Sequence, residues 1–254
     1  MASRLLVVPD VHQDYKFLDA LAEEQDFSSF DRIIFLGDFI DAKRSDYDTV
    51  KSLRKTLKRV KRIVAEHGPK VVLIPGNHDL PYFGARPAGN NRGLRNVKMA
   101  SYGCGPIEPE IQRALIKHWE PDIWDQFVPL HLENGFLFSH AGLGPEWWSE
   151  LSGPMDSVEM CLAAVNAIWE AAAEGQFSPL FQAGWARGGE LPIGGPYWLD
   201  FHQEFSDELP FPQIVGHTSG SFARQSGRSW CLDARQSIYA IVTKEVEVHR
   251  IRGR

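Results

Sequence analysis

The feature that most constrains the fold of this chain is a set of five short apolar runs, each followed by a turn that carries Asp, Asn or His. The runs span 5–8, 33–36, 71–74, 136–138 and 213–215. Continuous apolar runs of this length are typical of strands that are buried on both faces of a sheet. Helical patterns at about 16–24 and 49–67 separate the first three runs, and Gly68-Pro69 closes the second helix. The N-terminal part therefore predicts a β-α-β-α-β unit.

The rest of the chain predicts further helices and a strand-rich end. A helix is expected at about 110–119, where the pattern is otherwise loose. The C-terminal segments that alternate as antiparallel strands do are 229–233, 237–242 and 246–251. The stretch from about 144 to 208 is rich in Trp and Gly, has a helix near 158–174, and is interpreted as an insertion above the sheet edge. No repeat or linker divides the sequence, so a single domain over residues 1–254 is predicted.

Composition excludes several classes of protein. The formal net charge of -6 argues against a chain that coats nucleic acid, and the basic run at 51–62 reads as the solvated face of an amphipathic helix. No apolar stretch is long enough for a signal peptide or a membrane span. The three cysteines, Cys104, Cys161 and Cys231, are far apart and in no metal-binding spacing, which suits a reducing compartment. A soluble, cytoplasmic protein is expected, with no membrane partner.

The polar residues after the five runs can meet in space although they are far apart in the sequence. They are Asp10 with His12, Asp38, Asn77 with His78, His140, and His217. In open α/β sheets the carboxyl ends of the strands face one crevice. Each residue taken alone is better explained as a turn residue, a helix cap or a hydrogen-bonded histidine, but together they would require five coincidences. Carboxylates, imidazoles and one amide suit Mn, Fe or Zn rather than Ca or a thiolate-bound zinc.

These positions resemble, in chain order, the five signature blocks of the calcineurin-like metallophosphoesterase superfamily. The blocks are Asp10-Val11-His12, Gly37-Asp38-Phe39-Ile40-Asp41, Gly76-Asn77-His78-Asp79, Ser139-His140-Ala141-Gly142 and Gly216-His217-Thr218. Many phosphodiesterases of the superfamily end in Gly-His-x-His, whereas here Ser219 follows Thr218. The chain therefore looks more like the branch that holds phosphoprotein phosphatases and diadenosine tetraphosphate hydrolases. The resemblance implies an α/β fold, a four-layer αββα sandwich of two mixed sheets flanked by helices.

The resemblance also implies a cofactor of two divalent or trivalent metal ions, with Mn expected first and Fe or Zn as alternatives. The first ion would be held by Asp10, His12 and Asp38, and the second by Asp38, Asn77, His140 and His217. Asp38 would bridge the two ions. Two such cations can share a hydroxide that attacks phosphorus in line, so no covalent phosphoenzyme is needed.

Two further residues are expected to be catalytic. In the family, the His of Gly-Asn-His protonates the leaving group, and the Asp of the second block orients it. These positions are His78 and Asp41 here. The chemistry agrees, because a carboxylate beside an imidazole raises its pKa and fixes its tautomer.

The match departs from the family at the residues that bind phosphate. Phosphoprotein phosphatases place an Arg directly after the second-block Asp, whereas this chain continues Ala42-Lys43-Arg44. Arg44 is the substrate-binding candidate at this place, with Lys43 as a point charge that could replace it. Arg187 matches the family's second phosphate-binding Arg; the alternative is a surface Arg stacked on Trp185.

An aromatic set in the insertion has two interpretations. Its members are Trp147, Trp148, Trp185, Tyr197 and Trp198. They could form a wall for a base or an aromatic ester, or they could simply pack the core of the insertion.

Three functions from different classes remain open on the sequence. The first is a phosphatase for monoesters, with phosphoprotein Ser/Thr as a candidate substrate. The second is a hydrolase of dinucleoside polyphosphates or other nucleotides, which would use the same ligands. The third is a scaffold that has lost catalysis, and the intact ligand set speaks against it. Nucleic-acid ends are a less favoured substrate because the chain is acidic.

Overall fold

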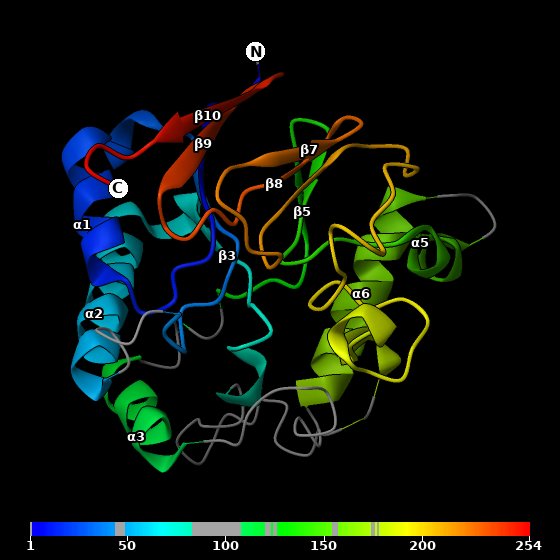
Figure 1. Ribbon diagram of the computed structural model, residues 1–254, viewed down its shortest axis with the longest axis horizontal. Helices are drawn as coiled ribbons and strands as arrows, with labels where there is room; N and C mark the ends of the chain where they lie inside the picture. The colour runs from blue at the N-terminus through cyan, green and yellow to red at the C-terminus, as the bar shows by residue number, and fades with distance from the viewer. Residues whose placement is uncertain are drawn as a thin grey trace.

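The computed structural model describes residues 2–43, 49–82, 108–119, 123, 126–153, 157–173, 176 and 178–254. In this part of the chain, two mixed five-stranded sheets stand side by side with helices on the two outer sides (Figure 1). Helices α1, α2 and α3 cover one sheet, and α5 and α6 lie beside the other (Figure 1). The α/β sandwich expected from the family resemblance is confirmed.

The first sheet has the strand order β10-β9-β1-β2-β3. Its strands are β1 (Leu5–Val8), β2 (Arg32–Phe35), β3 (Val71–Leu73), β9 (Ile238–Val242) and β10 (Val246–Arg250). The β1, β2 and β3 strands are parallel, and β9 runs antiparallel to β1. The expected β-α-β-α-β unit therefore forms one half of this sheet, with the carboxyl ends of its three strands on the same edge.

The second sheet has the order β4-β5-β6-β8-β7. Its strands are β4 (His131–Glu133), β5 (Phe136–Phe138), β6 (Gln213–Val215), β7 (Arg224–Ser226) and β8 (Ser229–Cys231). The sequence prediction grouped β8 with the antiparallel tail, but β8 pairs in parallel with β6. The strands β4 and β7 were not predicted. Both are short edge strands without a buried residue, so they carry no apolar run.

The helices begin where local side chains can cap them. Their bounds are α1 (Tyr15–Glu24), α2 (Val50–His67), α3 (Pro109–His118), α5 (Pro145–Ser152) and α6 (Val158–Ala173). Short 3₁₀ helices lie at Phe27–Ser29, Gly68–Lys70, Leu80–Tyr82, Pro179–Phe181 and Trp185–Arg187. Asp14 caps α1 by accepting from the amide of Phe17, and Thr49 and Ser52 form a reciprocal capping box at α2.

The alternation of side chains along the strands explains why the first sheet is buried on both faces. Leu6 and Val8 of β1 pack against the helices, whereas Leu5 and Val7 belong to the core between the two sheets. A strand that is covered on both sides needs apolar residues at every position. This is the physical origin of the continuous apolar runs.

Candidate metal centre

The loops at the carboxyl ends of five strands bring the expected ligands together. Asp10 and His12 follow β1, Asp38 follows β2, Asn77 and His78 follow β3, His140 follows β5, and His217 follows β6. The side chains of these residues are buried, except for that of His78, which is half-buried. Both sheets therefore contribute to one site.

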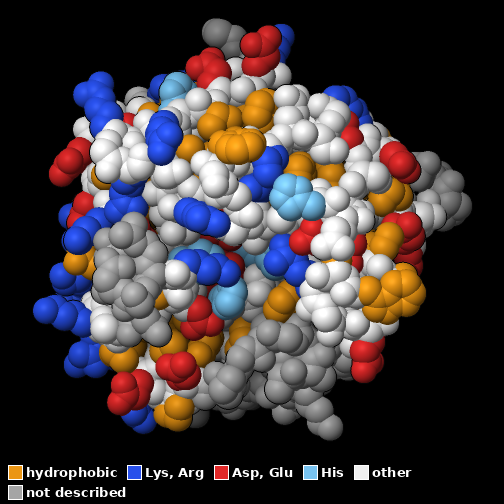
Figure 2. Space-filling view, viewed as in Figure 1, with side chains coloured by type: hydrophobic (Ala, Val, Ile, Leu, Met, Phe, Trp, Pro, Cys, Tyr) orange, Lys and Arg blue, Asp and Glu red, His pale blue; other side chains and the backbone are white. Residues whose placement is uncertain are grey.

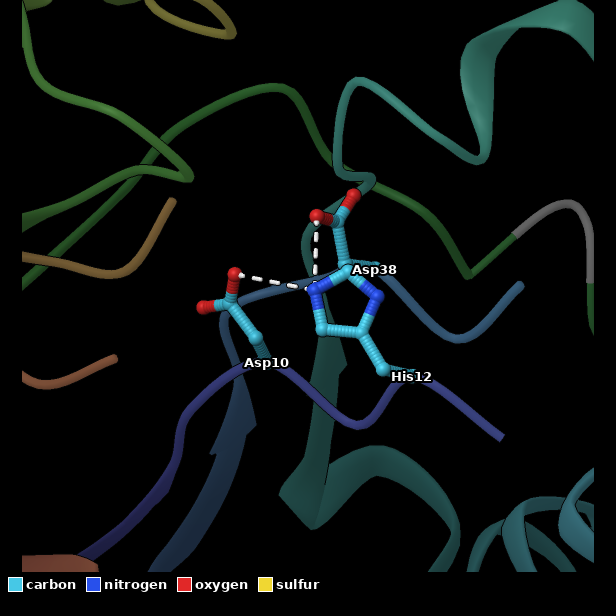
Figure 3. A group of neighbouring side chains, drawn as sticks. All are labelled: Asp10, His12 and Asp38. Atoms are coloured by element: carbon cyan, nitrogen blue, oxygen red, sulfur yellow. Dashed lines mark ion pairs between the residues drawn. The ribbon is translucent and has the colours of Figure 1, made fainter. Parts of the chain in front are cut away.

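Asp10, His12 and Asp38 form a buried group that could hold a metal ion (Figure 3). The Nε2 atom of His12 lies 3.7 Å from Oδ2 of Asp10 and 3.3 Å from Oδ2 of Asp38. Its Nδ1 atom donates to the carbonyl oxygen of Asp41 at 2.8 Å. Because a carbonyl can only accept, Nδ1 carries the proton and Nε2 keeps its lone pair. This buried Nε2 has no hydrogen-bond partner among the described residues, as expected of a metal ligand without its ion.

Asn77, His140 and His217 form a second group. Oδ1 of Asn77 lies 3.0 Å from Nε2 of His140 and 2.9 Å from Nδ1 of His217. The Nδ1 atom of His140 donates to the carbonyl oxygen of Leu36 at 2.7 Å, so its Nε2 is an acceptor. An amide oxygen and an imidazole lone pair that face each other at this distance repel unless a proton or a cation lies between them. The donors present therefore fit a cation.

One oxygen of Asp38 links the two groups. Oδ2 of Asp38 lies 3.3 Å from Nε2 of His12 and 3.6 Å from Nε2 of His140. Its other oxygen, Oδ1, accepts from the backbone amide of His78 at 3.0 Å, which fixes the carboxylate in place. The residue expected to bridge two ions thus lies between both sets of donors.

The backbone is strained where it presents these side chains. His12, Asp38, Asp41 and His217 have φ between 43° and 64°, a region that residues other than glycine seldom adopt. Such strain persists only where the surrounding structure over-determines it, and it concentrates at functional sites.

Two glycines leave room for the carboxylates. A Cβ on Gly76 would lie 2.0 Å from Oδ1 of Asp38, and one on Gly216 would lie 2.0 Å from Oδ1 of Asp10. Both carboxylates also accept from the backbone beside these glycines. The amide of His217 donates to Asp10 at 3.1 Å. These contacts explain the glycine before Asn77 and before His217 in the sequence.

The electrostatics of the site differ between its two carboxylates. Burial raises the pKa of Asp10 to about 6, helped by the nearby charge of Asp38 and opposed by His140. Burial acts in the same direction on Asp38, but His140, His78 and His12 outweigh it and hold the pKa of Asp38 below its usual value. Burial also lowers the pKa of His12 and of His217, so both are neutral at pH 7 and able to bind a metal.

His78 and Asp41 form a pair beside this centre. Nδ1 of His78 lies 2.9 Å from Oδ2 of Asp41, and the imidazole contacts His12 edge to face at 5.4 Å between ring centroids. Burial alone would lower the pKa of His78, but Asp38 and the hydrogen bond with Asp41 raise it. The arrangement gives an imidazolium that stays protonated at a higher pH than a free histidine.

Asp79 is a buried residue to which the sequence prediction gave no role. Its Oδ1 accepts from the amides of Phe39 and Ile40, and its Oδ2 accepts from the amide of Gly76. It thereby ties the loop after β2 to the loop after β3. Its position directly after His78 in the third block was the available signal. Burial and the charge of Asp38 raise the pKa of Asp79 well above its usual value.

Arg187 lies on the side of the centre formed by His217. Its Nη2 atom donates to Oγ1 of Thr218 at 2.9 Å and pairs with Oδ2 of Asp200, also at 2.9 Å. Thr218 directly follows His217, and its hydroxyl also accepts from the amide of Phe201. The sequence prediction did not single out Asp200 or gave Thr218 a role, since neither stands in a recognisable pattern.

The other candidates for substrate contact have different outcomes. Arg44 lies outside the described residues. Of the aromatic set, Trp148, Tyr197 and Trp198 are buried in hydrophobic clusters, as the packing interpretation expects. Trp185 is 67% exposed.

A four-layer sandwich with buried Asp and His donors at its strand ends defines a metal-binding hydrolase. Residues 3–219 match the family described as calcineurin-like phosphoesterase, and the chain belongs to that family. It is a metallophosphoesterase, and members of this family typically depend on two metal ions.

Individual relatives are more distant. A symmetrical bis(5'-nucleosyl)-tetraphosphatase of Aromatoleum aromaticum is 24% identical over 192 residues, which cover 72% of this chain and 62% of that protein. The chain thus spans less than two thirds of this relative's length. The crystal structure of a cold-active protein-tyrosine phosphatase of a psychrophilic Shewanella species has a TM-score of 0.57 at 17% identity, over 99% of this chain and 81% of the other. A second structure of a cold-active protein tyrosine phosphatase gives 0.57 at 16% identity, over 98% and 79%. These two likenesses concern the fold.

The helices show no sign of a membrane segment: among the described residues, none is both long enough and apolar enough to span a bilayer.

Proposed function

We propose that the chain is a dinuclear metal-dependent phosphatase that hydrolyses phosphate monoesters. The observation that supports this most is the place of Asp38, whose Oδ2 lies within 3.6 Å of donor atoms from both groups. In the proposal, one ion is held by Asp10, His12 and Asp38, and the other by Asp38, Asn77, His140 and His217. When bound, two such cations supply positive charge that activates water and neutralises the phosphate oxygens.

In this proposal His78 moves the proton that the leaving oxygen needs. Asp41 holds Nδ1 at 2.9 Å, so Nε2 is the nitrogen that is available to donate. The raised pKa keeps this proton in place near neutral pH, where a general acid is most effective.

Arg187 is proposed to bind the phosphate oxygens that face away from the attacking water. Its guanidinium can form two parallel hydrogen bonds with a phosphate. Asp200 and Thr218 already hold one end of this guanidinium, so little side-chain entropy is lost on binding.

Metal identity and location are also proposals. A donor set of carboxylate, imidazole and amide oxygen suits manganese, with iron or zinc as alternatives. The described cysteines, Cys161 and Cys231, are free and buried, which supports a reducing cytoplasm. A single domain over residues 1–254 remains the prediction.

A second candidate function is the hydrolysis of dinucleoside polyphosphates. The observation in its favour is the likeness to the symmetrical bis(5'-nucleosyl)-tetraphosphatase. The metal ligands and His78 would serve it without change.

One experiment tests the proposal and ranks the two candidates. Protein stripped by a chelator is assayed with and without added Mn on p-nitrophenyl phosphate, a phosphopeptide, a mononucleotide, diadenosine tetraphosphate and a phosphodiester. We expect no turnover in the stripped protein and recovery with Mn, fastest on the monoesters. Full activity in excess chelator, with no bound metal by elemental analysis, would contradict a metal-dependent mechanism.

A further inference from the structure

A cavity of about 530 Å³ opens beside the metal centre. It is lined by Lys43, Ser219, Arg235 and Gln236. Three of these residues border the centre directly. Lys43 lies two residues after Asp41, Ser219 lies two residues after His217, and Nε2 of Gln236 donates to the backbone carbonyl of Asp10 at 3.1 Å. The face viewed in Figure 2 shows such a hollow, with His side chains on its floor and Lys and Arg side chains beside it.

The charge of this cavity is positive. Lys43 and Arg235 are exposed, and neither side chain has an ion pair or a hydrogen bond with any described residue. The carboxylates nearby are occupied or covered. Asp41 pairs with His78, and Asp233 is buried under the turn that carries Arg235.

The turn that carries Arg235 is built to hold a strained conformation. Arg235 and Gln236 have φ of 56° and 55°, two successive left-handed residues that are not glycine. Oδ1 of Asp233 accepts from the amide of Arg235 at 3.2 Å, and Nη1 of Arg254 donates to the carbonyl oxygen of Gln236 at 3.1 Å. Strain that the surroundings maintain in this way marks a position under functional constraint.

The two cations become unfavourable once the centre is loaded. Two divalent ions outweigh the carboxylates of Asp10 and Asp38, so a loaded centre is itself net positive. Lys43 and Arg235 add further positive charge at the same opening. A ligand with more than one negatively charged group offsets this repulsion better than a single phosphate does.

We propose that Lys43 and Arg235 form a second anion subsite, which binds the next phosphate of a substrate that carries a phosphate chain, such as a nucleoside or dinucleoside polyphosphate. This inference rests on the proposed phosphatase function, because it places the first phosphate at the metal centre. It also assigns the specificity for chain length to residues that take no part in metal binding. Ser219 and Gln236 complete the lining without adding negative charge.

The test compares two anions that the enzyme cannot hydrolyse. Inorganic phosphate and methylenediphosphonate are titrated by calorimetry into the Mn-loaded protein, with Mn in fixed excess. We expect the diphosphonate to bind at least about tenfold more tightly, which corresponds to about 1.4 kcal/mol. In Arg235→Asn this preference should fall to within about threefold, and Lys43→Gln, in a different loop, should lower it as well.

Asn is the chosen replacement because it tolerates positive φ and therefore preserves the turn. The matched control is Lys244→Ala. It removes one exposed positive charge just after β9, at the sheet edge opposite the centre, and should leave the preference unchanged. A wild-type protein without the preference, or an Arg235→Asn variant that keeps it, would overturn the second subsite. Turnover of p-nitrophenyl phosphate with Mn, measured on the same samples, tests the phosphatase proposal separately.

Discussion

The metal-facing loops and the inserted region hold their functional side chains in different ways. In the loops, buried ligands are fixed by backbone amides and carbonyls at the ends of core strands. Oδ1 of Asp38 accepts from the amide of His78, and Nδ1 of His140 donates to the carbonyl of Leu36. In the insertion, the half-buried Arg187 is held by two side chains, those of Asp200 and Thr218.

The insertion itself is organised by a single half-buried carboxylate. Glu204 accepts from the amides of Ala186, Gly194 and Asp200, at distances between 2.9 and 3.3 Å. A Cβ on Gly184 would lie 2.2 Å from its Oε1, so the chain packs closely around it. The difference implies that catalysis is built into the sheet ends, whereas substrate contact depends on a polar structure that can vary without disturbing the metals. The following predictions test that division.

The largest effect is expected for Asp38→Asn. This change removes the negative charge shared by both donor groups, whereas changes in residues behind metal ligands alone typically cost 10- to 100-fold in affinity. Metal affinity should fall more than about 100-fold, and turnover should fall with it for every substrate. Elemental analysis after dialysis against limiting Mn measures the loss.

The control for Asp38→Asn is Asp26→Asn. Asp26 is an exposed helix cap, and Asn caps equally well, so this variant makes the same chemical change without consequence. An Asp38→Asn protein that bound both ions as tightly as the wild type would refute the bridging role.

The next effect is expected for His78→Asn. General acid catalysis typically contributes 10²–10⁴-fold, and an aryl leaving group needs little of it. The variant should retain its metals, slow alkyl phosphates by this factor, and hydrolyse p-nitrophenyl phosphate nearly as fast as the wild type. A loss of metal would instead identify His78 as a ligand.

The sequence predicted the sheet ends far better than the insertion, for a physical reason. A strand buried on both faces must be apolar throughout, and its ligand must follow at the turn, so both leave a local pattern. Asp10, Asp38 and His217 could therefore be located without a structure. Asp200 and Glu204 act through contacts made by a folded loop, and such contacts follow no period or spacing.

The cavity residues were missed for a related reason. Arg235 becomes part of the opening only because the strained turn after β8 is fixed to the backbone of Asp10 through Gln236. That contact joins positions 226 residues apart. Edge strands such as β4 and β7 also escaped prediction, since a half-exposed strand of three residues has no apolar run.

A smaller effect is expected for Arg187→Ala. If Arg187 binds the phosphate, its loss removes charge-assisted hydrogen bonds worth about 1.5–3 kcal/mol each. Between about 10- and 100-fold should be lost from kcat/KM. The loss should be larger for monoesters, which carry more charge than diesters, and Arg187→Lys should rescue it only in part because an ammonium cannot form two parallel bonds. Monoester turnover within twofold of wild type would show that Arg187 is a surface residue.

The smallest effect is expected for Glu204→Gln. A glutamine keeps one acceptor oxygen but loses the charge and the second acceptor, so at least one of the three amides it binds is left to water. Because the side chain is half-buried, we expect a loss of about 1 kcal/mol in the free energy of unfolding. KM for monoesters should rise a few-fold as Arg187 loses its exact placement, while Mn affinity stays unchanged. Glu208→Gln, an exposed carboxylate on the same segment, is the control and should alter neither quantity. Thermal unfolding and Mn titration of both variants decide whether the insertion and the centre are independent: a parallel fall in Mn affinity in Glu204→Gln alone would show that the insertion also supports the metals through Thr218 and His217.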